Sequence, residues 1–190
     1  MRNVVSHMHV SLDGFMSGPG GELDWTDEYH DDEMWNDVRD LMSTADAVLF
    51  GRVTYQLFED YWPGAGTNPV SPKSEIDFSN WIEKTEKFVF SKTLEKVDWK
   101  NATLVHENAA KKVAALKKLS GKNMVVFGST TLASHLFKEG LIDEHWINVH
   151  PVVLGKGKPF LKGLDDRHKL LRVGSKQFES GVVGLRYRKI

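Results

Sequence analysis

The residues best suited to chemistry follow short apolar runs of the chain. The run 47–50 is followed by Gly51, Arg52, Val53 and Thr54, a pattern typical of a buried strand that leads into a helix. Glycine allows a sharp backbone turn and a close approach to a ligand. The first turn of a helix leaves N–H groups unpaired at the positive end of its dipole, where a phosphate can bind. The spacing therefore predicts an anion site at this junction.

The same pattern recurs at a second place. The run 124–127 is followed by Gly128, Ser129, Thr130 and Thr131, again a strand, a glycine and a hydroxyl-rich helix start. Two such junctions could face one pyrophosphate group.

A third strand end also carries donors, because the run 87–90 is followed by Ser91 and Lys92. Ligands of open α/β sheets lie outside the carboxyl ends of the strands, so a dinucleotide could occupy all three positions. An acidic residue at the adenosine ribose would favour a free 2′-hydroxyl group. Ser91, Lys92 and Arg52 suit a 2′-phosphate instead, and this predicts NADPH as the cofactor.

Other ligand signatures are absent from the sequence. Gly155-Lys156-Gly157 lacks the third glycine of a dinucleotide-binding fingerprint and precedes no helix, and the chain has no Walker-type sequence. His7 and His9 share one face of the first predicted strand, but no third ligand follows at a recognisable spacing, so we expect no metal site.

The elements that must position these residues alternate along most of the chain. Strands are expected at 4–12, 47–50, 87–90, 102–105, 124–127 and 144–154, helices at 27–43, 52–61, 74–83, 109–119 and 130–138, loops at 17–24 and 62–69, and a final antiparallel pair at 169–178 and 182–188. This order predicts an α/β fold with a mostly parallel sheet, an antiparallel edge and helices on both faces.

Composition limits the class of protein. A chain of 190 residues fits one domain, 1–190, and no apolar run approaches the roughly 20 residues that span a bilayer. The chain has no cysteine, which excludes disulfides and thiolate metal sites. A net charge of -1 argues against a nucleic-acid partner. The N-terminus lacks the apolar region of a signal peptide, so we expect no membrane partner and a cytoplasmic location.

Several short motifs, taken in order, carry a resemblance to a known family. The chain resembles the dihydrofolate reductase-like superfamily, in particular the RibD C-terminal domain family of bifunctional deaminase-reductases. The motifs are Ser11-Leu12-Asp13-Gly14, Gly51-Arg52-Val53-Thr54-Tyr55, Ser91-Lys92, Phe127-Gly128-Ser129, and Gly140-Leu141-Ile142-Asp143-Glu144 leading to Pro151-Val152-Val153-Leu154-Gly155-Lys156-Gly157.

The resemblance implies a three-layer fold with a central mixed sheet of about eight strands. It also implies an NADPH-dependent oxidoreductase that reduces a small pteridine-like or pyrimidine-like heterocycle. Such an enzyme is related to the 5-amino-6-(5-phosphoribosylamino)uracil reductase of riboflavin biosynthesis, and a homodimer is expected. The implied cofactor contacts are Gly51, Arg52, Thr54, Ser91, Lys92, Gly128, Ser129, Thr130 and Thr131, with Met8, His9, Phe15 and Met16 near the nicotinamide and the segment 13–24 as a lid.

In dihydrofolate reductases a carboxylate early in the first helix holds the pteridine and assists its protonation. Counting back from Trp35, the aromatic residue one turn later, Asp31 is the best match and Asp32 is nearly as good. Neighbouring Trp and Met side chains would raise the pKa of this proton relay.

Two departures from the family pattern keep other functions open. Dihydrofolate reductases have paired glycines at the second junction, where this chain has Phe127-Gly128, and riboflavin-pathway reductases carry an acidic residue where this chain has Val126. One alternative is a non-catalytic nucleotide-binding or sensor protein on the same fold. The other is a true dihydrofolate reductase.

Overall fold

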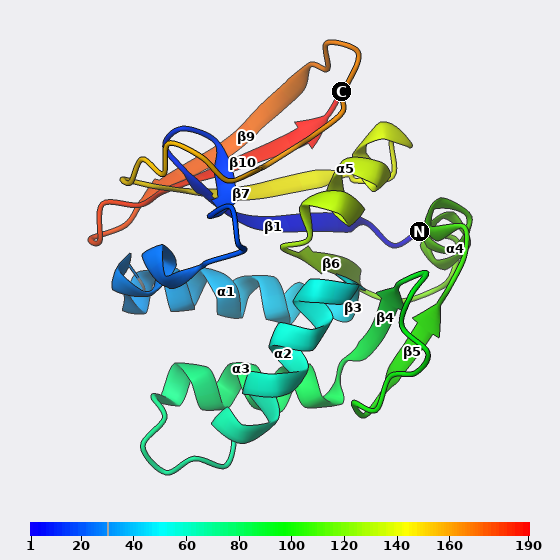
Figure 1. The fold of residues 1–190 in the computed structure, drawn as a ribbon, viewed down its shortest axis with the longest axis horizontal. Coiled ribbons are helices and arrows are strands. Elements are labelled where there is room, and N and C mark those ends of the chain that lie inside the picture. Colours follow the sequence, from blue (N-terminus) through cyan, green and yellow to red (C-terminus); the bar gives the residue numbers. More distant parts are fainter. Residues whose placement is uncertain (30) are drawn as a thin grey trace.

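An eight-stranded mixed sheet forms the centre of the computed structural model, which describes residues 1–29 and 31–190 (Figure 1). The strand order is β5-β4-β3-β6-β1-β7-β10-β9. The first six strands in this order are parallel to one another, whereas β10 pairs antiparallel with both β7 and β9. The sheet strands are β1 (Val4–Ser11), β3 (Ala45–Gly51), β4 (Glu86–Phe90), β5 (Ala102–Val105), β6 (Asn123–Phe127), β7 (Glu144–His150), β9 (Leu170–Gln177) and β10 (Val183–Lys189). The predicted parallel sheet with an antiparallel edge is confirmed.

Helices cover both faces of this sheet, because its central strands are apolar on both sides. The helices are η1 (Asp24–Tyr29), α1 (Asp32–Thr44), α2 (Arg52–Ala65), α3 (Lys73–Lys84), α4 (Ala109–Lys117) and α5 (Thr130–Lys138). One core contains Leu41, Tyr55 and Phe78 from α1, α2 and α3, and the other contains Val113 and Leu136 from α4 and α5. In the described part of the chain, no helix has the length and apolar character needed to cross a membrane.

Arg186 on β10 attaches α1 to the sheet. Its guanidinium group pairs with the Asp37 carboxylate and lies 3.9 Å from the centre of the Trp146 ring. Both members of the ion pair are largely buried. Removing one of them would leave an uncompensated charge, so this contact fixes the position of α1 over β10 and β7.

Two predicted loops are partly regular. The prediction of a loop from residue 62 is wrong for 62–65, because α2 continues to Ala65. The Trp62 ring lies 4.4 Å from that of Phe78, and the Trp62 carbonyl accepts a hydrogen bond of 2.7 Å from the Ser79 hydroxyl, so α3 supports this last turn. The predicted loop 17–24 shares only its two end residues with regular elements: Ser17 with β2 (Phe15–Ser17), which pairs with β8 (Lys158–Pro159), and Asp24 with η1.

The His145 imidazole is buried between the sheet and α5. Its Nδ1 atom lies 2.8 Å from the Ser6 hydroxyl, and the rings of Phe137 and Phe160 lie 5.3 and 6.5 Å away. Burial lowers the pKa of His145 to about 4. The ring is therefore neutral in the folded protein near pH 7.

This burial predicts a loss of stability in mild acid. Between pH 6.5 and about 4 the unfolded chain binds a proton at His145 that the folded chain does not bind, so the free energy of unfolding falls as the pH falls through this range. The full effect is on the order of 3 kcal/mol. Urea unfolding at several pH values should show a smaller loss for the double variant Ser6→Ala/His145→Leu. His106→Gln, at an exposed histidine, serves as the control and should lose as much stability in acid as the unmodified protein. An equal loss in the unmodified protein, the control and the double variant would contradict the prediction.

Candidate active site

A cavity of about 1290 Å³ opens at the carboxyl ends of β1, β3, β4 and β6. Pockets for a single small ligand usually have volumes of about 300–1,000 Å³. This cavity therefore has room for two ligands, such as a cofactor and a substrate.

The starts of α2 and α5 meet at this cavity. Gly51 and Ser129 are the residues that precede the two helices, and neither helix start has a side-chain cap. A Cβ atom on Gly51 would lie 2.1 Å from the Ser129 hydroxyl oxygen and 3.1 Å from the Ser129 Cβ atom, so the two helix starts approach each other closely. Two sets of unpaired N–H groups thus face the cavity together, an arrangement suited to a pyrophosphate.

Cationic side chains lie beside these helix starts. Gly51 is opposite Phe90 in the parallel register of β3 and β4. Arg52 and Ser91 therefore come directly after the ends of two adjacent strands. The Ser91 hydroxyl accepts hydrogen bonds from the backbone N–H groups of Thr93 and Leu94, at 3.1 and 3.0 Å, and so shapes the turn. Arg52 and Lys92 are exposed and line the cavity. Their positions suit a second anionic group next to the pyrophosphate position.

Most of the predicted cofactor residues come together at this cavity. The lining includes His9, Met16, Gly51, Arg52, Thr54, Ser91, Lys92, Gly128, Ser129, Thr130 and Thr131. Met8 and Phe15 are not part of it. Met8 is fully buried in the opposite core, because alternate residues of a strand face opposite sides and its neighbours His7 and His9 take the cavity side. Phe15 lies on β2, where it pairs with Pro159.

The second junction has an unusual backbone. Gly128 and Ser129 have φ angles of 56° and 57°, both in the left-handed region. Two successive residues at this junction thus have a backbone conformation that favours glycine, although the second is a serine. A serine rarely adopts this conformation, and its cost of about 1–2 kcal/mol must be offset by the surrounding contacts.

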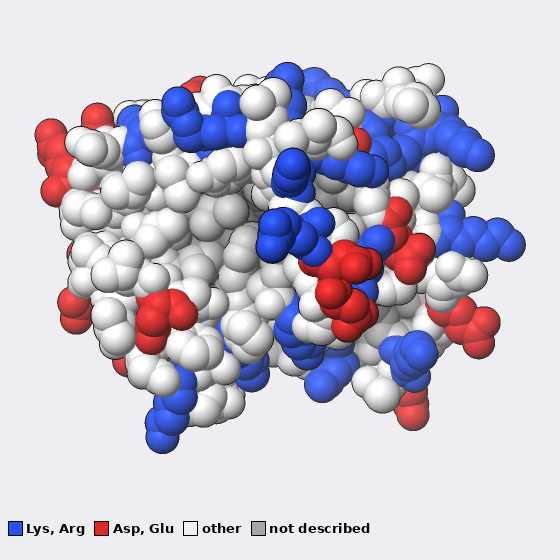
Figure 2. Space-filling view, turned by 90° about the horizontal axis from the view of Figure 1, so that it is seen from above, with Lys and Arg blue, Asp and Glu red and all other residues white. Residues whose placement is uncertain are grey.

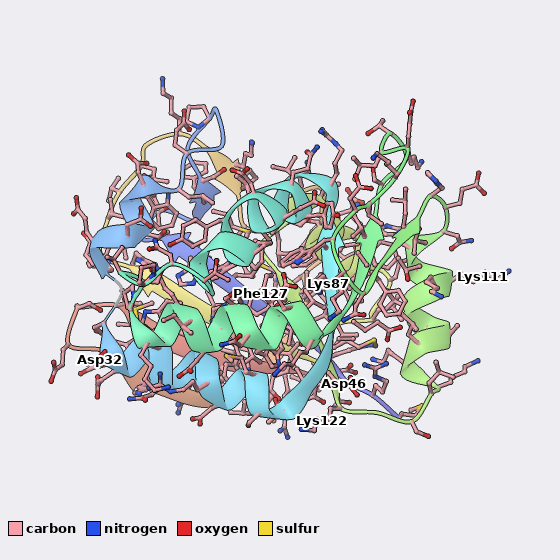
Figure 3. The ribbon with its side chains drawn as sticks, turned by 90° about the horizontal axis from the view of Figure 1, so that it is seen from below. Asp32, Asp46, Lys87, Lys111, Lys122 and Phe127 are labelled. Carbon is pink, nitrogen blue, oxygen red and sulfur yellow. The ribbon has the colours of Figure 1, made fainter. Side chains whose placement is uncertain are left out.

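The predicted acid, Asp31, lies at the start of α1 and outside the cavity lining. Its carboxylate accepts hydrogen bonds from the backbone N–H groups of Met34 (2.7 Å) and Ser180 (2.9 Å). Burial raises its pKa, but these hydrogen bonds outweigh burial, and the net pKa is lowered. The predicted direction of the shift was therefore wrong. Asp32 is exposed and lies at the outer end of α1, far from Phe127 at the centre of the molecule (Figure 3).

Histidines of β1 form one part of the cavity wall. His7 and His9 line the cavity from β1, and His9 Nδ1 lies 2.8 Å from Nε2 of the buried His150 on β7. The rings of Trp25 and Tyr29, from η1, lie 5.1 and 5.4 Å from the His150 ring. Within 1–29 and 31–190, no group of three or more His, Asp or Glu side chains is placed to hold a metal ion.

Five aromatic rings form another part of the wall, which we call the aromatic chamber. Its members are Trp35, Phe58, Trp62, Phe78 and Phe127, from α1, α2, α3 and β6. Neighbouring ring centres lie 4.4 to 6.5 Å apart. Sequence reasoning did not assemble these rings into one wall.

Two further groups of lining residues were missed. His106, Glu107 and Asn108 follow β5, and the rule applied to the other strand ends would have found them. Lys158 and Lys162 line the cavity from β8 and the segment after it, and the sequence carries no signal for this placement.

A family model and a related protein match almost the whole sequence. The sequence model described as RibD C-terminal domain matches residues 2–184. The uncharacterized protein YyaP of Bacillus subtilis (strain 168) is 33% identical over 186 residues, which cover 98% of this chain and 94% of YyaP.

Solved structures share the architecture at low identity. A putative riboflavin biosynthesis protein from Shewanella sp. PV-4 has a TM-score of 0.77 and 22% identity, and the match covers 100% of this chain and 99% of that one. Dihydrofolate reductase from Enterococcus faecalis, complexed with NADP(H), has a TM-score of 0.61 and 13% identity, with 98% and 96% coverage. The chain therefore has the dihydrofolate reductase-like fold.

Proposed function

Because this chain belongs to the RibD C-terminal domain family, a family of reductases, we propose that it is an NADPH-dependent reductase of a small heterocyclic compound. One observation carries the proposal: two uncapped helix starts meet at Gly51 and Ser129, and exposed cations flank them in one large cavity. The E. faecalis dihydrofolate reductase with the same fold binds NADP(H), which also supports this cofactor.

The chain's own residues would bind and orient the cofactor. The N–H groups at the starts of α2 and α5 would hold the pyrophosphate, with the hydroxyl groups of Thr130 and Thr131 as further donors. Arg52 and Lys92 would pair with the 2′-phosphate. The bound cofactor supplies a hydride, and the protein contributes position, charge and exclusion of water.

The charge of Lys92 should decide the choice of cofactor. We expect Lys92→Gln to weaken NADPH binding by about ten-fold and to leave NADH binding almost unchanged, because only NADPH carries the 2′-phosphate. Titration of cofactor fluorescence measures both affinities. Lys73→Gln, an exposed lysine on α3 outside the cavity lining, is the matched control. Equal binding of NADPH and NADH by the unmodified protein would refute the cofactor assignment.

Turnover separates a reductase from a nucleotide-binding sensor on the same fold. A reductase should consume NADPH with at least one member of a panel of pterins, pyrimidines and quinonoid compounds. Dihydrofolate belongs to the panel, because true dihydrofolate reductase activity is the remaining alternative. Binding of NADPH without any consumption would favour the sensor. The homodimer and the cytoplasmic location stay predictions.

A further inference from the structure

The aromatic chamber is built as a binding surface as well as a core. The Trp62 and Phe78 rings lie 4.4 Å apart, and the Phe58 and Phe127 rings 5.8 Å apart with an interplanar angle of only 32°. Trp35 closes the chamber from α1, 6.5 Å from Trp62. Most other ring pairs of the chamber meet edge to face. Aromatic side chains favour a flat, conjugated ligand, which can stack against their faces or meet their edges.

Three apolar side chains of the cavity lining remain exposed. Leu23, Val53 and Leu57 line the cavity, although 42%, 52% and 49% of their surface is open to solvent. Apolar side chains gathered on one exposed surface mark a binding site, because burying them on binding is favourable. The open surface of the lining thus fits an occupant that is partly apolar.

Charged groups of the lining come from other parts of the cavity. They are Arg52 at the start of α2, Lys92 and Glu107 after β4 and β5, Glu139 after α5, and Lys158 and Lys162 from the β8 segment. Arg52 and Trp62 are ten positions apart on one helix, or roughly 15 Å. Among the described lining residues, α1, α3 and the Leu57–Trp62 part of α2 contribute no Lys, Arg, Asp or Glu.

The polar groups near the chamber suit a neutral ring edge. His7 and His9 face the cavity from β1, and the His7 ring lies 5.6 Å from that of Phe127. An imidazole can donate or accept one hydrogen bond at each nitrogen, so this corner can bind the carbonyl or ring nitrogen of a heterocycle. A phosphate or carboxylate buried against the aromatic rings would lack a cationic partner, and this costs affinity.

We infer that the substrate is a flat, uncharged ring compound without a phosphate or carboxylate group, bound in the aromatic chamber with its polar edge toward His7 and His9. The inference rests on the proposed function, because it leaves the cationic half of the cavity to NADPH. It separates this protein from a reductase that acts on a phosphoribosyl-substituted pyrimidine.

Matched ligand pairs test the inference without any turnover. Pterin is compared with pterin-6-carboxylate, and riboflavin with riboflavin 5′-phosphate, so that each pair differs in one anionic group. Saturating NADP⁺ keeps anionic ligands out of the cationic half, and quenching of ligand fluorescence measures affinity. In at least one pair the neutral member should bind about ten-fold more tightly than its anionic partner. An anionic member that binds equally or better in both pairs, or no binding by either neutral compound, overturns the inference.

Two tryptophans of α2 and α3 give a matched pair of variants. Trp62 and Trp81 are both half-buried and both pack against Phe78, with ring centres 4.4 and 5.5 Å away, but only Trp62 lines the cavity. Trp62→Leu should weaken binding of the neutral ligand by about ten-fold, and Trp81→Leu should change it by no more than about two-fold. Equal losses in both variants would mean a structural effect only and would contradict the chamber as the binding site.

A surface variant avoids the risk of misfolding. Leu57 is half-exposed, so Leu57→Lys adds a cation beside the chamber without emptying the core. In Leu57→Lys, the ratio of affinities within at least one ligand pair should shift toward the anionic member. Val70→Lys, at an exposed position outside the lining, should leave these ratios unchanged. Unchanged preferences in Leu57→Lys would overturn the inference. Failure of NADPH to bind in the cofactor titration described above would instead refute the proposed function, and the same ligand pairs would then be compared without NADP⁺.

Discussion

Replacement of Gly157 by alanine should reduce both NADPH affinity and stability. An added Cβ atom would lie 2.1 Å from the backbone carbonyl oxygen of Ser17 and 3.2 Å from the Phe15 Cβ atom. A backbone atom cannot rotate away as a side chain can, so β8 would have to move off β2. Overpacking of this kind costs about 1–3 kcal/mol.

The loss of affinity follows from the position of β2. Met16 on β2 lies beside the start of α5, with its sulfur 3.5 Å from the Thr130 hydroxyl, and Ser17, Gly157 and Lys158 line the cavity. The β2–β8 ribbon therefore covers the proposed cofactor half. We expect NADPH binding to weaken by about ten-fold or more.

Gly64→Ala is the matched control, because a Cβ atom on this helical glycine would meet no atom within 4 Å. It should bind NADPH normally and unfold at the same or a slightly higher temperature. Fluorescence titration and thermal unfolding measure the two quantities. Normal NADPH affinity in Gly157→Ala would show that the ribbon does not contribute to binding.

Asp31→Ala should destabilise the folded protein by about 2–4 kcal/mol. It removes the cap of α1 and leaves the Ser180 N–H without its acceptor. The pKa of Asp31 is lowered in the folded state, so the carboxylate stabilises the protein above pH 4. This contribution is lost as the pH falls through the lowered pKa.

Neighbouring variants separate this structural role from catalysis. Asp32→Ala removes an exposed carboxylate one position later and should change stability by no more than about 0.5 kcal/mol. Urea unfolding measures both variants. If Asp31 is instead the proton relay, Asp31→Asn should fold with unchanged stability, bind NADPH and lose turnover, and that result would contradict the role assigned from the geometry.

Local patterns of the sequence were sufficient for the order of strands and helices and for bringing most of the predicted cofactor residues to one cavity. The runs before Gly51, Ser91 and Gly128 are short, apolar and followed at once by donors, and parallel strands bring such ends to one edge of the sheet.

On one face of the molecule, Lys and Arg gather at the centre and along one edge, beside a broad uncharged area (Figure 2).

The proposed substrate half depends on long-range contacts and could not be predicted in the same way. Each ring of the aromatic chamber resembles an ordinary core residue of its own helix or strand, and only packing brings α1, α2, α3 and β6 together. The direction of the Asp31 carboxylate depends on where α1 begins and on the backbone of Ser180, 149 positions later. Neither fact has a local signal in the sequence.

The central place of β1 in the sheet has a consequence for folding. Val4 pairs with Met124 on β6, and Val5 pairs with Glu144 on β7, so both neighbours of the first strand are made more than a hundred residues after it. Pairings so distant along the chain close slowly, because a large loop must be ordered first. During synthesis, β1 has no strand to pair with until most of the chain has emerged from the ribosome, so its apolar residues stay unprotected. Chaperones that bind extended apolar segments have their longest opportunity at this strand.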